Sequence, residues 1–561
     1  MKPKHIISLL AVAAITAACS DTWDDHYPKE QSNGTQRLLS IMEGNPQLSD
    51  FVKVAKATHL YNNMHVTKVT YADLLAADQA LTVWAPLNGS YNVDSLLEMC
   101  KTAKGDSLVG QQFMANHIAH NIYTMSEKND KSIKMLNDKM VHLAQLKFGS
   151  SSLISGHFNT PATNGLLHVI DKNAPFAYNI YEGLTCLPEF SHIGDFLLKY
   201  EEQKLDEDRS IVAGIVDGEK IYSDSVMIRR NILFNSLGKI NTEDSAYHML
   251  VPSKEIWDEQ YKEAEKYFNF GNLAKADSIQ AYWTNVCLLQ DLIYNMNQQP
   301  SPKDSLFSVG YRECFLNVEK NWARSTAWPY HIYYQPYDEG GIFSNSYVSG
   351  SMLSSNGMFY RLKEWPFTRE NLFYQYVKTE AEREPNITEY VQCNMNYRSA
   401  FADSISGGYL DIVPKNSTSN WKIEFEISHT LSATYDICAV ILPKQVYNQY
   451  SKDYKPNQFK ALITYIDTNG REQTIRINDK LHNDPYHVDT VKIARVTLPV
   501  ASYAQTTPVL KVQFECSMTS KESATYSREM YLDCIYLRPV SDDEKNDEST
   551  NNAVARKEDL K

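Results

Sequence analysis

Two short stretches decide the fold of the first half of the chain. They are Leu81-Thr82-Val83-Trp84-Ala85-Pro86-Leu87-Asn88 and Asn164-Gly165-Leu166-Leu167-His168-Val169-Ile170-Asp171. The first is a compact apolar run that stops at a proline. The second opens with an Asn-Gly turn and continues into an alternating run, a pattern typical of a hairpin that leads into a buried strand.

The same pair of stretches occurs a second time in a looser form. Residues 247–254 take the place of the first stretch and residues 356–362 that of the second. Each pair follows a helix-like segment, residues 49–53 in one copy and 194–199 in the other. Because three landmarks keep their order, we interpret the pattern as an internal duplication.

The spacing between the landmarks predicts an insertion in the second copy. From Pro86 to Asn164 is 164 − 86 = 78 positions, whereas from Pro252 to Asn356 is 356 − 252 = 104, so the second copy holds about 26 extra residues. We expect the aromatic stretch 322–343 to be this insertion.

The first copy resembles the fasciclin domain, a wedge of β-strands with helices packed at one end. The resemblance rests on the strand-Ala-Pro-x-Asn and Asn-Gly-x-x-His-Val-Ile-Asp-Lys blocks, and on Asn116-His117 and Leu136-Asn137-Asp138-Lys139. The second copy has lost Ala-Pro-x-Asn and His-Val-Ile and keeps only their positions. The resemblance implies fasciclin-like domains at residues 36–177 and 178–368. It also implies a role in adhesion or interaction, because fasciclin domains are such modules.

The N-terminus predicts export and lipidation. A basic start and the apolar run 6–18 form a secretory signal that is too short to span a bilayer. Thr16-Ala17-Ala18-Cys19 resembles the lipobox of bacterial lipoproteins, which makes residues 1–18 the signal peptide and Cys19 the lipidated residue of a linker over 19–35. The alternative is an ordinary signal peptide with an incidental cysteine.

The acidic residues that follow Cys19 predict where in the cell envelope the protein is located. Residues 20–25 resemble the signal that sends lipoproteins of some Gram-negative glycan-degrading bacteria to the outer face of the outer membrane. The alternative is a solvated periplasmic linker. We expect a lipid-anchored protein of the outer membrane that faces the cell exterior and contacts the membrane through its lipid alone.

Length and charge narrow the class of protein. The 561 residues should hold about three or four domains of ~150 residues. The formal net charge is −13, with 55 Lys+Arg against 68 Asp+Glu and no basic block, which argues against nucleic-acid binding. No further apolar run reaches the ~18 residues that a spanning helix needs.

The cysteines and histidines give little sign of metal or redox chemistry. The eight cysteines after Cys19 include no Cys-x-x-Cys pair, and most lie in apolar runs, so we expect small core side chains in preference to disulfides. Cys516 and Cys534 are the pair that could lie on neighbouring strands. His117 and His120 could share a metal, but no carboxylate or cysteine lies beside them and the fasciclin resemblance makes His117 a core residue. We expect no metal and no cofactor.

The aromatic insertion is the candidate ligand-binding segment. Exposed aromatic rings with polar neighbours can stack on pyranose faces. The same run could instead be an apolar lid packed on its own domain, or a docking patch for another protein. The candidate residues are Trp322, Trp328, Tyr330, Tyr333, Tyr334 and Tyr337.

From residue 369 to 540 the pattern changes to short alternating runs, typical of an antiparallel β-sandwich with few helices. The expected strands cover 409–413, 421–427, 435–442, 459–465, 491–496, 510–514 and 530–537. The last run, 531–539, is similar to the final strand of jelly-roll carbohydrate-binding modules, although a docking or spacer domain fits equally well. Residues 541–561 are charged and Asn-rich and should be disordered. The overall class is thus α+β, with two fasciclin-like β-wedge/helix domains before a jelly-roll-like sandwich.

The sequence lacks the common catalytic motifs: Gly-x-Ser-x-Gly, the phosphate-binding glycine loops and His-Glu-x-x-His. Asp206-Glu207-Asp208 lies in a polar stretch with nothing to raise a carboxyl pKa. The leading hypothesis is a non-catalytic accessory protein of an outer-membrane glycan-uptake system of the starch-utilisation type. It would bind polysaccharide or dock onto the importer and lipoprotein complex. The alternatives are a cell-adhesion or matrix-interaction protein and, third, a glycan hydrolase with scattered carboxylates.

Overall fold

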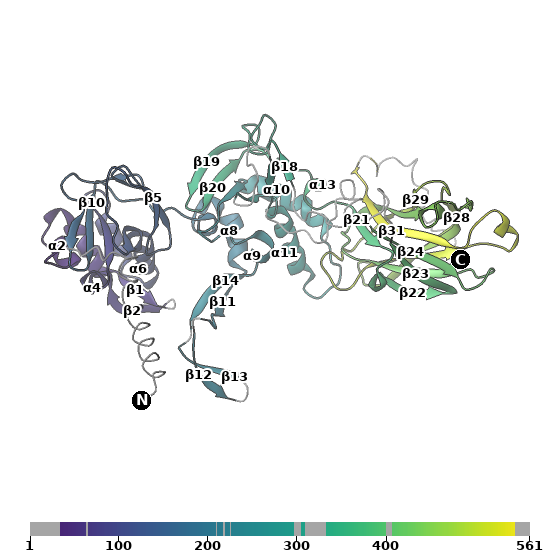
Figure 1. The fold of residues 1–561 in the computed structure, drawn as a ribbon, viewed down its shortest axis with the longest axis horizontal. Coiled ribbons are helices and arrows are strands. Elements are labelled where there is room, and N and C mark those ends of the chain that lie inside the picture. Colours follow the sequence, from purple (N-terminus) through teal and green to yellow (C-terminus); the bar gives the residue numbers. More distant parts are fainter. Residues whose placement is uncertain are drawn as a thin grey trace, which may run out of the picture. The chain divides into compact units, whose positions relative to one another are not determined.

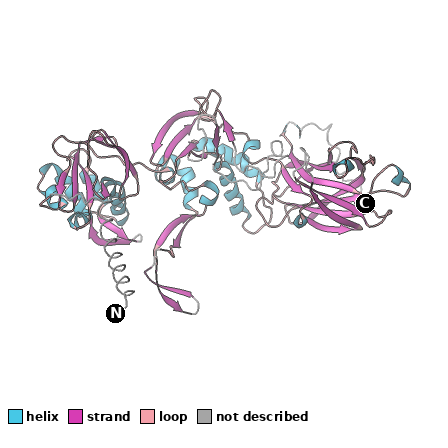
Figure 2. Cartoon of the chain, in the orientation of Figure 1, coloured by secondary structure: helices cyan, strands magenta, loops and turns pink. Residues whose placement is uncertain are grey.

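The structure is a computed structural model of the 561-residue chain. It describes residues 34–62, 65–208, 210–216, 219–224, 226–296, 305–308, 332–399, 407–542 and 544. Helices and strands are mixed throughout, and most strand pairs are antiparallel, as an α+β protein requires (Figure 2). Among these residues, no helix is long and apolar enough to cross a membrane. The chain divides into two compact units, residues 1–178 with 202–230 and residues 179–201 with 231–561.

The first unit packs short helices against a four-stranded sheet (Figure 1). Its helices are α2 (Leu38–Glu43), α3 (Ser49–Ala57), α4 (Tyr71–Ala76), α5 (Val93–Met99) and α6 (Ala103–Val109). The sheet runs β4 (Ile118–His120), β3 (Leu81–Pro86), β10 (Gly165–Ile170) and β9 (Thr160–Ala162). A second sheet holds β5 (Asp130–Lys134), β6 (Met140–Ala144), β7 (Lys147–Phe148) and β8 (Ser151–Ser152), and β1 (His59–Asn62) pairs with β2 (His65–Thr70).

The second copy repeats this plan with longer connections. Its helices are α7 (Ile180–Cys186), α8 (Ser191–Leu198), α9 (Phe234–Leu237), α10 (Lys254–Ala264) and α11 (Ala276–Leu289). Its sheet runs β16 (Ile293–Asn295), β15 (Tyr247–Val251), β20 (Gly357–Leu362) and β19 (Val348–Ser354). Three further strand pairs follow. β17 (Ser305–Phe307) pairs with β18 (Ile332–Tyr334), and an arm holds β11 (Glu201–Leu205) paired with β14 (Met227–Asn231) and β12 (Ile211–Val216) paired with β13 (Glu219–Asp224).

The two quoted stretches form the centre of the first sheet. β3 and β10 pair in parallel, with Gly165 opposite Leu81. Just before β10, the buried Asn164 side chain accepts a hydrogen bond from the Leu38 backbone N–H at 2.9 Å. Its amide group donates to the carbonyls of Leu75 and Ala77 at 3.0 and 2.6 Å. One side chain therefore ties the first helix and the segment before β3 to the start of β10.

Asn356 makes the same connections in the second copy. β15 and β20 are again a central parallel pair. The Asn356 side chain accepts from the Ile180 backbone N–H at 2.8 Å and donates to the carbonyls of Ile240 and Thr242 at 2.9 and 2.8 Å. The internal repeat inferred from the sequence is thus present in the sheet order and in its central hydrogen bonds.

The glycine after each asparagine allows the strands to meet. Gly165 and Gly357 have φ values of +153° and +152°. A Cβ at Gly165 would lie 1.9 Å from the Leu81 carbonyl oxygen, and one at Gly357 would lie 1.7 Å from the Tyr247 oxygen. Only glycine fits such a close backbone approach.

The C-terminal region is a sandwich of two antiparallel sheets that follows the one-turn helix α13 (Arg369–Leu372). One sheet runs β23 (Cys393–Ser399), β24 (Gly408–Pro414), β31 (Met530–Pro539), β26 (Thr434–Leu442) and β29 (Asp489–Thr497), with β21 (Val377–Glu380) also paired to β31. The other runs β22 (Ile387–Val391), β25 (Lys422–Ile427), β30 (Leu510–Cys516), β27 (Gln458–Ile466) and β28 (Glu472–His482). All seven expected strands are present.

Four strands of the sandwich were not expected. β28 has mostly exposed residues on both faces and therefore lacks the alternation that reveals a strand. β21 and β23 are rich in polar residues, and β22 is largely exposed.

The cysteines behave mainly as core side chains. Cys287, Cys393, Cys438, Cys516 and Cys534 are buried, as expected of core side chains. The suggestion that Cys516 and Cys534 lie on neighbouring strands was wrong, because β30 and β31 belong to different sheets.

A single hydrophobic core joins the second copy to the sandwich. The buried Tyr503 ring lies 5.5 Å from that of Phe268 and 4.9 Å from that of Trp283, centroid to centroid. Beside it, the Asn269 amide donates to the Pro499 carbonyl at 3.1 Å. The second copy and the sandwich therefore depend on each other for burial of their aromatic side chains.

We expect Asn164→Ala and Asn356→Ala each to destabilise the protein by about 2–4 kcal/mol, because buried backbone groups lose their partners. Urea unfolding of the full chain measures this. Asn235→Ala, an exposed asparagine in α9, is the matched control and should change stability by less than about 0.5 kcal/mol. An Asn356→Ala variant as stable as the control would show that this buried amide does not secure the repeat.

Candidate functional site

The structure describes only part of the sequence-predicted ligand site. Trp322, Trp328 and Tyr330 lie outside the described residues, as does Cys19. Tyr333 is half-buried, and its hydroxyl lies 3.3 Å from Asp291 Oδ1.

The other two tyrosines of the set differ in exposure. Tyr334 is 69% exposed and Tyr337 is 37% exposed. The Tyr337 hydroxyl lies 3.0 Å from Nδ1 of His248, whose pKa burial lowers to about 4. A neutral imidazole can accept this hydrogen bond, so Tyr337 is held in place while Tyr334 presents an open ring. Sugar binding by this segment stays a prediction.

His117 is a structural residue of the first unit. It is fully buried, and its Nδ1 lies 2.7 Å from the Phe113 carbonyl while Nε2 accepts from the Ala174 N–H at 3.1 Å. Burial lowers the pKa of His117 to about 4. Both ring nitrogens are occupied, so His117 offers no ligand atom to a metal shared with His120.

A second aromatic group, not anticipated from the sequence, lies on two loops of the sandwich. We call residues 443–457, between β26 and β27, and residues 483–488, between β28 and β29, the tyrosine loops. Tyr447, Tyr450, Tyr454 and Tyr486 are 60%, 81%, 42% and 62% exposed. The rings of Tyr454 and Tyr486 stack with centroids 4.9 Å apart, which joins the two loops.

The tyrosine loops cover the face of the β24–β31–β26 sheet that points away from the sandwich core. Tyr409 of β24, Tyr531 of β31 and Leu442 of β26 form a small apolar cluster on this face. Val446 from one loop and Val488 from the other pack onto it. The exposed rings are therefore fixed to a rigid sheet through the apolar residues beneath them.

Polar groups lie under the exposed rings. Asp411 on β24 is fully buried, and its Oδ2 accepts from Arg398 Nε at 2.7 Å and from Asn396 Nδ2 at 3.1 Å. The Arg398 guanidinium lies 4.2 Å from the Tyr447 ring centroid. Asp411 Oδ1 and the Tyr409 hydroxyl are buried and have no hydrogen-bond partner among the described residues. These buried atoms leave hydrogen-bonding capacity for an internal water molecule.

Lys444 brings a buried cation to the same region. Its ammonium lies 3.8 Å from the Tyr531 ring centroid and 2.9 Å from Glu529 Oε2. Burial lowers the pKa of Lys444, and Glu529 opposes the change. The region thus combines open aromatic rings with charged side chains that are held in ion pairs.

Sequence reasoning missed the tyrosine loops because their residues are far apart in the chain. One local signal was available: Tyr447, Tyr450 and Tyr454 follow one another within a short polar segment. The contributions of Tyr486, Arg398 and Asp411 require the sheet order.

A buried carboxylate cluster lies where β21 pairs with β31. Ligand atoms of Glu380, Asp533 and Cys534 lie within 4.8 Å of one another. Asp533 is fully buried, and neither of its carboxylate oxygens has a hydrogen-bond partner among the described residues. Lys378 Nζ, 2.8 Å from Glu380 Oε1, supplies one positive charge.

The donor set of this cluster favours a hard cation if one binds. Burial raises the pKa of Asp533 to about 7, against the attraction of Lys378. Burial also raises the pKa of Cys534 well above its ordinary value, so its thiol is a poor ligand. Oxygen donors alone suit Ca²⁺. The cluster could hold such an ion, in competition with the Lys378 ammonium.

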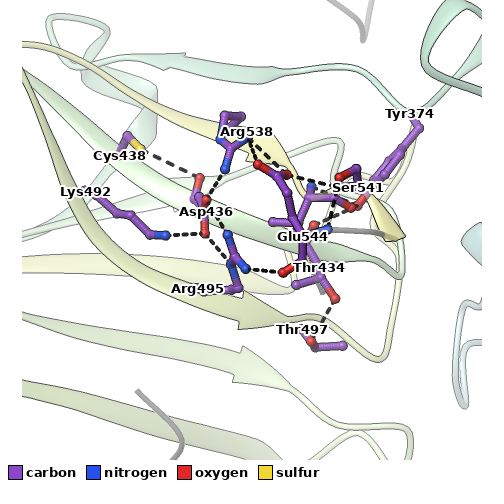
Figure 3. Close-up of polar contacts among 11 residues, drawn as sticks. Tyr374, Thr434, Asp436, Cys438, Lys492, Arg495, Thr497, Arg538, Ser541 and Glu544 are labelled. Carbon is purple, nitrogen blue, oxygen red and sulfur yellow. Dashed lines mark hydrogen bonds and ion pairs between the residues drawn. The ribbon is translucent and has the colours of Figure 1, made fainter. Parts of the chain in front are cut away.

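A third cluster is fully satisfied and structural (Figure 3). The buried Asp436 carboxylate lies 2.9 Å from Lys492 Nζ and 2.8 Å from Arg495 Nε, and it also pairs with Arg538. Burial raises the pKa of Asp436, but its hydrogen bonds to these three cations outweigh burial and hold the pKa well below its usual range. Arg538 also holds Glu544 at 2.9 Å, so the network fixes the end of the described chain to the sandwich.

No protein-family model and no curated protein matches the chain. Among solved structures, it is similar to the domain pair of the insect cell adhesion molecule Fasciclin I, at 12% identity and a TM-score of 0.19, over 52% of this chain and 90% of that chain. It is also similar to a family 35 carbohydrate-binding module from Clostridium thermocellum, at 9% identity and a TM-score of 0.18, over 30% of this chain and 99% of that chain. A third similarity is to CBM22-1–GH10 modules of the C. thermocellum xylanase 10B, at 10% identity and a TM-score of 0.20, over 29% of this chain and only 28% of that chain. These similarities do not assign the chain to a family.

Asp533 should make stability pH-dependent. The pKa of Asp533 is about 7 in the folded protein and 3.8 ordinarily. The contribution of this carboxyl group to folding stability is therefore fully present below about pH 4 and is lost as the pH rises through 7. We therefore expect the free energy of unfolding of Asp533→Asn, relative to that of the wild type, to rise by about 2–4 kcal/mol between pH 4 and pH 8. Chemical unfolding in the presence of EDTA measures this difference.

The Tm of the wild type and of Asp533→Asn with and without Ca²⁺ tests whether the cluster binds a cation. If Ca²⁺ binds the carboxylates, it should raise the wild-type Tm above pH 7 and leave that of Asp533→Asn nearly unchanged. An unchanged wild-type Tm would mean that Lys378 alone balances the cluster. A pH-independent difference between the two proteins in EDTA would contradict the titration of Asp533.

Proposed function

We propose that this protein is a non-catalytic glycan-binding protein and that the tyrosine loops form its binding site. The observation that carries the proposal is the set of four exposed tyrosines on two loops that the stacked rings of Tyr454 and Tyr486 join. Exposure of an aromatic ring to water is unfavourable, and binding of another molecule to the ring relieves it. A group of exposed rings on fixed loops therefore indicates a recognition surface.

The chemistry of the loops suits a polysaccharide. The CH groups of a pyranose face can pack on the electron-rich face of a tyrosine ring, while neighbouring polar side chains bond the hydroxyls. Tyr450 offers the most open ring, at 81% exposure. Arg398 lies against one face of Tyr447 and leaves the other for a ligand. Tyr454 and Tyr486 stack on each other, so each has one outer face.

The cellular setting is part of the proposal. The lipobox-like residues before Cys19 and the acidic segment after it support a lipid-anchored protein on the outer face of the outer membrane. There it would hold polysaccharide for an outer-membrane importer and its partner lipoproteins. The alternative is an adhesion protein in which the same tyrosines contact another protein, since tyrosine and arginine are also enriched in protein interfaces.

Glycan hydrolysis has less support. A general acid needs a raised pKa and access to substrate. Asp533 has the raised pKa, about 7, but it is fully buried, where no polysaccharide can reach it. A turnover assay on the same polysaccharides tests this point directly, and product release would contradict a purely binding role.

We expect Tyr450→Ala and Tyr486→Ala each to weaken polysaccharide binding roughly ten-fold or more, because each removes a stacking ring. Isothermal titration of the full mature chain against plant, microbial and host polysaccharides measures this. Tm should not change for Tyr450→Ala, since its ring is open.

Two further variants separate the candidate sites. Tyr334→Ala removes an equally exposed tyrosine from the other aromatic segment, and Trp322→Ala with Trp328→Ala tests the rest of that segment. If these variants lose binding and the Tyr450 and Tyr486 variants keep it, the insertion is the site and the tyrosine loops are not. If no polysaccharide binds the wild type, the glycan proposal fails.

A further inference from the structure

The segment that leads from the first copy into the second is anchored mainly at one residue. Residues 172–178 lie between the end of β10 and the start of α7, and we call them the connecting segment. Ala174 is its one buried residue, and the residues on either side of it are exposed or half-buried. The contacts of Ala174 therefore decide whether the connecting segment stays on the first unit.

Two consecutive side chains bind both backbone groups of Ala174. The Asn116 amide donates to the Ala174 carbonyl at 3.1 Å, and Nε2 of His117 accepts from the Ala174 N–H at 3.1 Å. Asn137 in turn donates to Oδ1 of Asn116 at 3.1 Å, which fixes the orientation of that amide. Asn116, His117 and Ala174 are all buried, so each of these bonds satisfies a group that water does not reach.

The contacts of His117 require its neutral form. Nδ1 lies 2.7 Å from the Phe113 carbonyl oxygen, which can only accept a hydrogen bond, so Nδ1 carries the proton. Nε2 then keeps the lone pair that the Ala174 N–H needs. A second proton, on Nε2, would face that N–H directly. The imidazolium can therefore form only when Ala174 moves away and water reaches Nε2.

The surroundings of His117 disfavour a positive charge. The rings of Phe51, Phe113 and Phe148 lie 6.3, 5.0 and 6.3 Å from the imidazole, centroid to centroid. Burial lowers the pKa of His117 to about 4, and the hydrogen bond to the Phe113 carbonyl opposes this change. An apolar aromatic cage of this kind gives an imidazolium no compensation for lost water.

No charged side chain among the described residues contributes to the pKa of His117. Lys139 is buried nearby, but its ammonium lies 5.1 Å from the Phe176 ring centroid. His168 of β10 is also buried, and burial lowers its pKa to about 4, so it is neutral as well. The other charged residues of the elements packed against His117 are exposed or half-buried: Asp50, Lys53 and Lys56 on α3, Lys147 on β7, and Lys172 on the connecting segment.

The second copy shows that the repeat does not require this histidine. Leu292 directly precedes β16, as His117 directly precedes β4, and the two strands have equivalent registers with β15 and β3. Counted from Gly165 and Gly357, Pro366 is the counterpart of Ala174, because 174 − 165 = 366 − 357 = 9. Proline has no N–H to donate and leucine has no acceptor. Both members of the hydrogen-bonded pair are therefore absent together from the second copy.

We propose that His117 is an acid-sensitive latch, which holds the connecting segment on the first unit while it is neutral and releases the segment when it is protonated. The seven released residues can span up to about 24 Å, so acid lengthens the free connection between the two copies. The latch lies within the first unit and does not depend on the proposed glycan binding.

Acid favours the released state because that state binds the second proton more tightly. The pKa of His117 is about 4 with the segment in place and 6.5 ordinarily. The segment is therefore fully held above about pH 6.5, and its release becomes more favourable as the pH falls from 6.5 towards 4. Between pH 7.5 and pH 4.5 the equilibrium constant for release rises by up to roughly 80-fold.

Hydrogen exchange of the full mature chain without its lipid, resolved to single residues, tests the latch at pH 7.5 and pH 4.5. The protection factor of the Ala174 amide, corrected for the pH dependence of intrinsic exchange, should fall roughly 80-fold. The amides of Val83 in β3 and Leu167 in β10 should keep their protection within about three-fold. So should the amide of Lys363, which donates to the Tyr347 carbonyl just before Pro366 in the second copy.

His117→Gln is the matched variant, because its amide oxygen can accept from Ala174 but does not titrate. Protection of Ala174 in this variant should be the same at both pH values. Equal protection of Ala174 at both pH values in the wild type would overturn the proposal. A parallel loss at Val83 and Leu167 would also overturn it, because the first unit would then be unfolding as a whole. An acid response that persists in His117→Gln would do the same, and if this variant does not fold, the comparison within the wild type decides.

Discussion

The backbone contact at the start of each central parallel pair sets the geometry of both repeats. Gly165 and Gly357 bring β10 and β20 so close to β3 and β15 that no other residue fits. The preceding asparagines then use one side chain to satisfy three backbone groups from distant segments. This arrangement fixes where the first helix, the central strand and the final strand of each copy meet. The rest of each copy can vary in length without disturbing it, because loop insertions cost little free energy.

Sequence patterns revealed the parts of the fold that repeat or alternate. The Asn-Gly stretches, the two copies and seven sandwich strands all have local signals, because burial of one face imposes a period on the sequence. β28 had none, since it is exposed on both faces. The division of the strands between two sheets was equally hidden, so the suggestion that Cys516 on β30 and Cys534 on β31 lie on neighbouring strands was wrong. The mixed α+β class could be predicted, whereas the fasciclin assignment stays a prediction.

The candidate sites also differ in whether a local sequence pattern reveals them or only the fold does. The aromatic segment around Tyr334 is contiguous in sequence and was visible at once, but contiguity says nothing about which rings are open. The tyrosine loops come from two separate segments, and only the fold brings Tyr447 of one loop next to Arg398 on β23 and joins the two loops through Tyr454 and Tyr486. Asp533 shows the limit most clearly. In the sequence it is one acidic residue in an apolar strand. Its raised pKa arises because the fold buries it, and Lys378 on the paired strand β21 opposes that rise.

The shared core of the second copy and the sandwich fixes the sheet that carries the tyrosine loops to the rest of the second unit. Tyr503 lies between Phe268 and Trp283, so the sandwich alone would expose a large aromatic surface. Asn269 adds hydrogen bonds to Pro499 and Ser432 on either side of this contact. Force on a ligand bound to the tyrosine loops would therefore be transmitted to the whole of the second unit, because the sandwich is not joined to it by a flexible linker alone. Such a rigid connection suits a protein that holds a long polymer, because force on the ligand is shared by one continuous core and not concentrated in a flexible linker.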